Sequence, residues 1–142
     1  QWQPVFDEFN VDLVLQGHDH TYGRGENVAS GTSGQLKGAG PMYVVSVSGP
    51  KMYMLAEHSA KNMDRVGEDI QLFQVIEFQK DRIVYQARTA TGQLYDAFDI
   101  EKASDGKKSI IDRRPDTPTS LCSNPAERSG SSCWSGTSFV QP

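Results

Sequence analysis

The chain has 142 residues, a formal net charge of −4 at pH 7 and 37% hydrophobic residues. This length favours a single domain, and the mild, dispersed charge excludes a basic stripe of the kind that binds nucleic acid or an anionic membrane surface. No apolar run approaches the roughly 20 residues that a transmembrane helix needs, so we expect no membrane segment.

The first part of the chain predicts a helix, a strand and a loop with two histidines. Residues 4–10 predict a short helix, with proline in its first turn. Residues 11–16 alternate in the manner of a strand. Strand periodicity would place His18 and His20 on one side and Asp19 on the other, where we expect it to be replaceable. Gly17 indicates that the histidines leave the sheet edge on a loop.

The His-x-His pair is typical of metal binding, because neutral imidazole is the commonest protein ligand for zinc, iron and related ions. The pair is only part of a site, since one catalytic zinc takes about three protein ligands and a two-metal site needs a set for each ion. The alternative is a plain pair of surface histidines. The third histidine, His58, lies in a polar stretch and is expected to be solvated.

The middle of the chain predicts a loop followed by an antiparallel sheet. Residues 23–40 are rich in glycine and predict a mobile loop, either a plain connector or a substrate lid. Residues 42–48 predict a strand, and residues 56–70 predict a loop with one helical turn. Residues 72–78 predict a central strand covered on both faces, followed by two more strands of a meander. The aromatic residues of these strands are expected in the core: Phe73, Phe78, Tyr85, Tyr95 and Phe98.

The last part of the chain is polar and has no periodic pattern. We therefore expect an ordered part at residues 1–102 and a disordered or loosely attached tail at 103–142. Cys122 and Cys133 are the only cysteines. In an exported protein they would close a small disulfide loop, contributing about 3 kcal/mol at most, whereas in a cytosolic protein they would stay reduced. We favour the disulfide, because a cysteine pair in a polar tail has no core to serve.

Four segments together resemble one enzyme family. The string GHDHTYGR resembles the GHxHxYxR segment of the calcineurin-like metallophosphoesterases, most closely the purple acid phosphatase branch. PVFDEFN before it, and PMYVVSVSGPKMY and GQLYDAFDI after it, resemble the helix and strands that flank this segment in the family. The resemblance covers roughly residues 2–101. The chain departs from it at Gly23, where purple acid phosphatases usually carry Glu.

The resemblance implies an α/β fold, the family's four-layer β-sandwich flanked by helices, of which this chain supplies the C-terminal, mostly antiparallel β part. It implies two metal ions (Fe, Zn or Mn), with His18 binding the divalent ion and His20 the other, often ferric, ion. Both histidines would then be catalytic metal ligands. It further implies that Gly17 permits a tight approach, that Tyr22 and Arg24 brace the loop, and that a phosphate-ester small molecule or nucleotide is the substrate.

The family's other ligand segments, such as Gly-Asn-His-[Asp/Glu], do not occur in residues 1–142. We therefore expect this chain to be the C-terminal piece of a larger phosphoesterase, inactive alone, with the upstream part of the same protein as its partner. The resembling phosphatases are commonly secreted, so we expect a secreted or periplasmic protein, with a cytoplasmic one as the alternative. The alternative function is a non-catalytic β-rich module that binds a partner through an open sheet edge.

Overall fold

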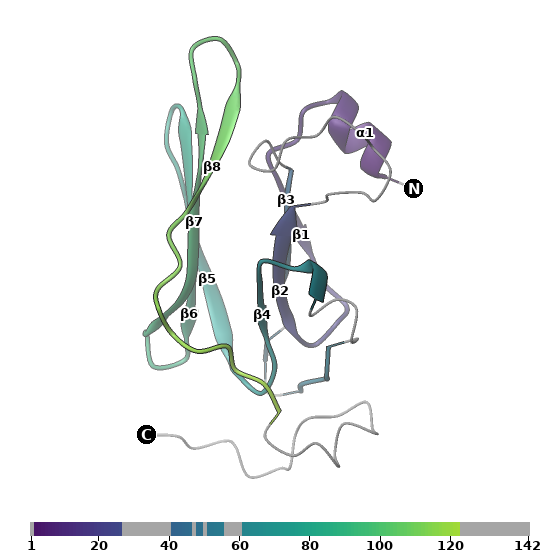
Figure 1. Cartoon of the computed structure of the whole chain (residues 1–142), viewed down its shortest axis with the longest axis vertical. Coiled ribbons are helices and arrows are strands. Elements are labelled where there is room, and N and C mark those ends of the chain that lie inside the picture. Colours follow the sequence, from purple (N-terminus) through teal and green to yellow (C-terminus); the bar gives the residue numbers. More distant parts are fainter. Residues whose placement is uncertain (1, 27–40, 47, 50, 56–60, 123–142) are drawn as a thin grey trace.

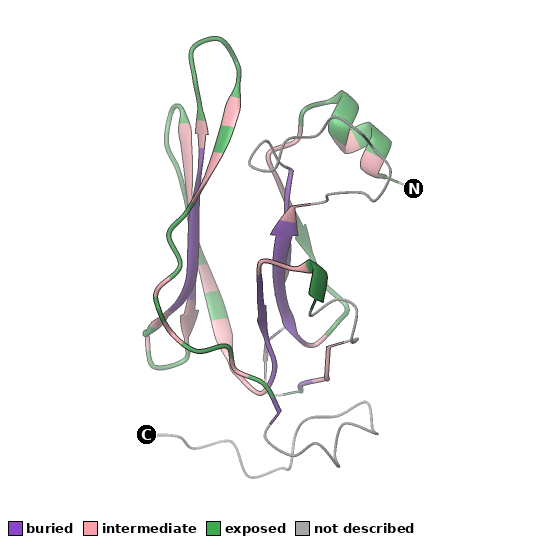
Figure 2. Ribbon diagram, viewed as in Figure 1, coloured by how far each residue is buried: buried purple, intermediate pink, exposed green. Residues whose placement is uncertain are grey.

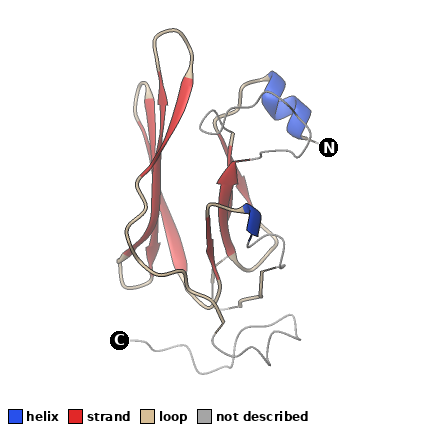
Figure 3. Ribbon diagram, in the orientation of Figure 1, coloured by secondary structure: helices blue, strands red, loops and turns tan. Residues whose placement is uncertain are grey.

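The computed structural model describes residues 2–26, 41–46, 48–49, 51–55 and 61–122, which form two four-stranded β-sheets facing each other (Figure 1). The described chain is mostly β, both sheets are mostly antiparallel, and helix is limited to one six-residue segment and a turn at 61–62 (Figure 3). The elements in chain order are α1 (Gln3–Glu8), β1 (Leu13–Gln16), β2 (Tyr22–Glu26), β3 (Met42–Ser46), β4 (Arg65–Gly67), β5 (Leu72–Phe78), β6 (Arg82–Thr89), β7 (Leu94–Lys102) and β8 (Lys108–Asp112).

The first sheet has the strand order β1-β3-β2-β4. β1 pairs with β3 in parallel, while β2 pairs antiparallel with both β3 and β4. The preceding helix begins with proline in its first turn, where a missing N–H costs nothing. It ends before Asn10, whose φ of 52° cannot continue a helix. The predicted helix and first strand are thus confirmed.

The second sheet is the antiparallel meander β5-β6-β7-β8. The core lies between the two sheets, where the central strands carry most of the buried residues (Figure 2). Both sheets contribute aromatic and aliphatic side chains to it: Tyr22, Met42 and Val44 from the first, and Tyr85, Ala87, Tyr95, Phe98 and Ile100 from the second. Burial of these side chains is the main favourable contribution to the packing of the two layers.

Two segments predicted as loops are strands. Residues 23–26 belong to β2 and not to a mobile loop, and residues 65–67 form β4 within a stretch expected to be a loop. The glycines of β2 have a packing role, because a Cβ at Gly23 would lie 2.4 Å from the Met63 sulfur. Because glycine has no side chain, the segment that leads into β4 can pack closely against β2. The rest of the predicted glycine-rich loop lies outside the described residues, as does His58.

The prediction that residues 72–78 form a central strand covered on both faces is wrong. β5 is the edge strand of its sheet, and one of its faces is open. Phe73 and Phe78 are 46% and 73% exposed, so neither belongs to the core, whereas the other three predicted core aromatics are buried. The apolar composition of β5 gave no sign of its edge position, because β5 pairs with β6 on one side and has no strand on its other side in the described structure.

The expected polar tail is ordered over its first part. Residues 108–112 form β8, which pairs with β7, and the sheet therefore continues past the expected boundary at residue 102. After β8 the chain crosses toward the first sheet. Arg113 N donates to Ala97 O at 3.0 Å, Arg65 Nη1 donates to Thr117 O at 3.0 Å, and Glu68 N donates to Ser120 O at 2.8 Å. Backbone hydrogen bonds and the hydrogen bonds of Arg65 therefore order this stretch, although its sequence has no apolar periodicity.

Candidate functional site

The two histidines lie in the loop between β1 and β2, as the sequence predicts. His18 occupies the turn itself, with a φ of 82°, a conformation that residues other than glycine rarely adopt. Its side chain is 93% exposed, and its Nδ1 lies 3.3 Å from Asp19 Oδ1. Gly17 is exposed and directly follows β1. The strained backbone position in this loop is therefore His18, a predicted metal ligand, which follows Gly17 in the sequence.

His20 is held by the segment 51–55. Its Nδ1 lies 2.9 Å from the carbonyl oxygen of Lys51, and its ring contacts the Tyr53 ring edge-on at a centroid distance of 4.9 Å. The Tyr53 amide also donates to the His20 carbonyl at 2.9 Å. A carbonyl oxygen can only accept, so in the neutral ring this bond places the proton on Nδ1 and leaves the Nε2 lone pair unprotonated. Metal-binding histidines commonly have this arrangement.

The two predicted bracing residues lie on β2 and point into the core, where both bind Asp96 of β7. The Tyr22 hydroxyl donates to Asp96 Oδ2 at 2.7 Å. Arg24 binds the same carboxylate with two bonds, Nε to Oδ2 at 2.8 Å and Nη2 to Oδ1 at 2.9 Å. All three side chains are almost fully buried. They connect the strand that follows the histidine loop to the opposite sheet.

Tyr22 and Arg24 each keep one protonation state in this buried network. Burial raises the pKa of Tyr22 far above its ordinary value, and the nearby Asp96 charge adds to this effect. Burial alone would lower the pKa of Arg24, but its hydrogen bonds and charge interaction with Asp96 outweigh burial and raise it. Tyr22 thus stays protonated and Arg24 stays charged, so this network supplies structure and no proton transfer.

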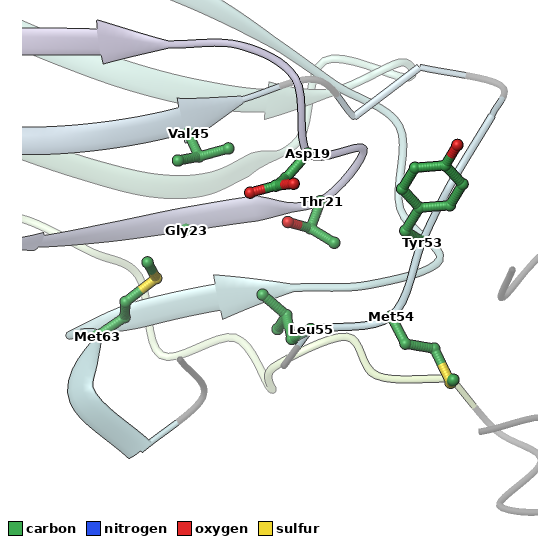
Figure 4. Close-up of a pocket in the computed structure, with 8 residues that line it drawn as sticks. All are labelled: Asp19, Thr21, Gly23, Val45, Tyr53, Met54, Leu55 and Met63. Carbon is green, nitrogen blue, oxygen red and sulfur yellow. The ribbon is translucent and has the colours of Figure 1, made fainter. Parts of the chain in front are cut away.

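A pocket of about 180 Å³ lies beside the histidine loop (Figure 4). Asp19 and Thr21 of the loop line it together with apolar side chains that include Val45, Leu55 and Met63. Tyr53, which contacts the His20 ring, also forms part of its wall. Asp19 is thus directed toward this pocket, and its carboxylate has His18 as its one polar side-chain partner among the described residues.

Within the described part of the chain, no group of three or more His, Cys, Asp or Glu side chains is close enough to hold a metal ion. His18 and His20 are therefore two donors of an incomplete set. Their chemistry fits a borderline metal such as zinc or iron, since both are imidazoles and His20 presents its Nε2 lone pair. Cys122 is buried, and its predicted partner, Cys133, lies outside the described residues, so their pairing stays a prediction.

Sequence reasoning missed the residues that hold the site from a distance. The sequence places Asp96 only in a closing strand, although a carboxylate between the apolar residues Tyr95 and Ala97 is a signal for a buried partner. Lys51 contributes only its backbone carbonyl, which no sequence pattern reveals. Glu68 lies in a polar stretch of the sequence, and its burial follows from the fold alone.

Comparisons with protein-family models, with curated proteins and with solved structures found no match to this chain. Across the residues that the structure describes, none of the helical segments has the length and apolar character needed to cross a membrane.

Proposed function

We propose that this chain contributes two imidazole ligands, His18 and His20, to a dinuclear metal centre that hydrolyses phosphate esters. The single observation that carries the proposal is the bond from His20 Nδ1 to the Lys51 carbonyl, because it directs the Nε2 lone pair to an incoming ion. The resemblance of GHDHTYGR to the metallophosphoesterase segment supports it. The two facing sheets would then be the β layers of that family's four-layer sandwich.

In this proposal each described residue has a distinct task. His18 and His20 bind the ions, which are Fe, Zn or Mn, and the remaining donors come from polypeptide other than the described residues. When bound, the ions would supply Lewis acidity toward the phosphoryl group and the attacking water. Tyr22 and Arg24 keep the loop fixed to the core through Asp96. Asp19 borders the pocket and is not a ligand.

The substrate class is a small phosphate ester or a nucleotide, and hydrolysis requires the upstream part of the protein. This requirement follows from the ligand count, because two imidazoles cannot complete the coordination of two ions. We further propose that the protein is secreted or periplasmic. A disulfide between Cys122 and Cys133 would agree with that location.

The test compares His18→Ala and His20→Ala in the full-length protein, with His58→Ala as the matched histidine control. Metal content is measured by elemental analysis and hydrolysis with p-nitrophenyl phosphate. We expect each loop variant to lose bound metal and to lower kcat/KM at least about 100-fold. Loss of a residue that only supports a metal ligand already costs about 10–100-fold, and loss of a ligand itself should cost no less. The control should retain both. A His20→Ala protein with full metal content and full activity would sink the proposal.

A second candidate is a non-catalytic interaction module, favoured by the apolar surface around α1 and β1. Trp2, Phe9 and Leu15 are exposed there, at 69%, 72% and 58%. β1 is the edge strand of its sheet in the described structure, so its outer backbone groups are available to another strand. Under this alternative the two histidine variants would leave the metal content of the purified full-length protein unchanged.

A further inference from the structure

The segment 51–55 contacts the His20 ring from outside the histidine loop, through the Lys51 carbonyl and the Tyr53 ring. The position of that imidazole therefore depends on what fixes this segment. The segment lies outside the strands of the nearby sheet, which in the described structure consists of β1, β3, β2 and β4. Something other than the hydrogen bonds of a β-sheet must hold it.

Glu68 supplies that support. Its side chain is buried, and its two carboxylate oxygens accept from two different backbone segments. Oε1 accepts from Leu55 N at 2.8 Å, and Oε2 accepts from Cys122 N at 2.9 Å. A carboxylate that accepts backbone N–H bonds in a buried setting makes hydrogen bonds of the stronger, charge-assisted kind. Glu68 thus joins the end of segment 51–55 to the chain that returns from the second sheet.

The position of Glu68 in the fold makes this support rigid. It directly follows β4, and β4 pairs with β2, the strand that follows the histidine loop. Its own backbone N–H donates to Ser120 O at 2.8 Å. Within the segment, Met52 packs against Cys122 in a small buried cluster. The loop that carries His20 and the segment that fixes its ring are therefore tied to the same sheet.

We propose that Glu68 is a positioning residue for His20. Its carboxylate holds segment 51–55 in place, so the Lys51 carbonyl keeps the proton on Nδ1 and Nε2 stays available for a metal ion. The inference rests on the proposed function only in treating His20 as a ligand. Removing the carboxylate would leave the buried Cys122 amide and the partly buried Leu55 amide without their acceptor, and the segment would move to hydrate them. His20 would then lose its fixed acceptor.

The test reads the tautomer of His20 directly in the metal-free 142-residue chain. Long-range ¹H–¹⁵N correlation spectra at about pH 8, where an ordinary imidazole is neutral, distinguish a proton on Nδ1 from one on Nε2. In the wild type we expect His20 to be the Nδ1–H tautomer. The His18 signals are assigned in the same spectra, because the Nδ1 of this ring also lies near an acceptor, Asp19 Oδ1 at 3.3 Å.

The variants are Glu68→Ala and Glu68→Gln, with Glu77→Gln as a control that removes the same charge from the exposed surface of β5. We expect His20 to become a mixture of tautomers in Glu68→Ala. Glu68→Gln keeps the side-chain volume and one acceptor oxygen, so a smaller change is expected and the fold is retained. The control should match the wild type. His20 remaining fully Nδ1–H in Glu68→Gln and Glu68→Ala, or being Nε2–H in the wild type, would overturn the inference.

A Zn²⁺ titration of the same variants in the full-length protein separates this inference from the proposed function. We expect Glu68→Gln to weaken Zn²⁺ binding about 10-fold, as is usual when the support of a metal-binding histidine is lost. A full-length wild-type protein that binds no Zn²⁺ would argue against the proposed function and leave the tautomer result intact. An unchanged tautomer with normal Zn²⁺ binding would overturn the positioning role alone.

Discussion

His18 and Arg24 belong to one short segment, yet their side chains are 93% and 2% exposed. The first half of GHDHTYGR forms a strained loop that presents imidazoles to solvent. The second half enters β2 and binds a carboxylate of the opposite sheet. The difference shows that the segment has a presenting part and an anchoring part. Changes to the anchoring part should lower the stability of the fold. Changes to the presenting part should impair the proposed function and have little effect on stability.

The largest expected effect is on the anchoring part, in Asp96→Asn. This variant removes the buried carboxylate that pairs with Arg24 and leaves only Asp112, a half-exposed carboxylate at 3.4 Å, and breaking such a buried pair costs about 3–5 kcal/mol of unfolding free energy. Urea unfolding measures the loss. Asp105→Asn is the control, because its pair with Lys107 is exposed to solvent and should contribute little to stability. A loss below about 1 kcal/mol for Asp96→Asn would show that the bond to β7 is not the anchor.

The buried tyrosines should make the anchoring part sensitive to alkali. Burial raises the pKa values of Tyr22, Tyr85 and Tyr95 in the folded state. An unfolded tyrosine ionises near pH 10, so above that pH the unfolded chain has lost protons that the folded chain keeps. Stability should thus be unaffected by these groups below about pH 10 and fall above it, by up to ~1.4 kcal/mol per pH unit for each tyrosine.

Urea unfolding between about pH 8 and pH 11 checks this expectation. In Tyr22→Phe the free energy of unfolding should decline less steeply with pH, because one fewer tyrosine contributes. The same decline in Tyr22→Phe as in the wild type would show that Tyr22 does not titrate differently in the two states.

A smaller effect is expected at Gly23, which lies in the anchoring part between Tyr22 and Arg24. A Cβ there would lie 2.4 Å from the Met63 sulfur, so Gly23→Ala should cost about 1 kcal/mol through overpacking. In a Met63→Ala background the same change should become stabilising by about 0.5 kcal/mol, since alanine restricts the unfolded chain. Gly25→Ala is the control, because its nearest contact would be an ordinary 3.4 Å. Equal effects of Gly23→Ala in both backgrounds would exclude Met63 as the cause.

The smallest effect is expected in the presenting part. His18 has a φ of 82° and an exposed side chain, so its replacement removes little packing. His18→Gly should be more stable than His18→Ala by about 1 kcal/mol, because glycine adopts this conformation without strain. Thermal unfolding of the two variants measures the difference. Equal stability would indicate that the loop relaxes when the histidine is removed.

Local patterns predicted much of the secondary structure and the place of the candidate loop. Proline at the start of α1 and the alternation of β1 depend on near neighbours in the sequence, and both elements are present, as are the strand predicted at 42–48 and the two strands predicted after β5. The same local reasoning failed for β2. Its glycines are typical of a loop, but Tyr22 and Arg24 find Asp96 on a distant strand, and that pairing outweighs the poor strand propensity of glycine.

The sequence by itself determined that this chain is β-rich and that two imidazoles follow its first strand. These properties are local, since they require only residue chemistry and short-range periodicity. Tertiary structure alone decided that β5 is an edge, that residues 108–122 are ordered, and that Lys51 and Glu68 hold His20. Each of these depends on contacts between residues far apart in the chain, and a backbone carbonyl or a buried carboxylate acquires its role only when the fold brings a partner to it.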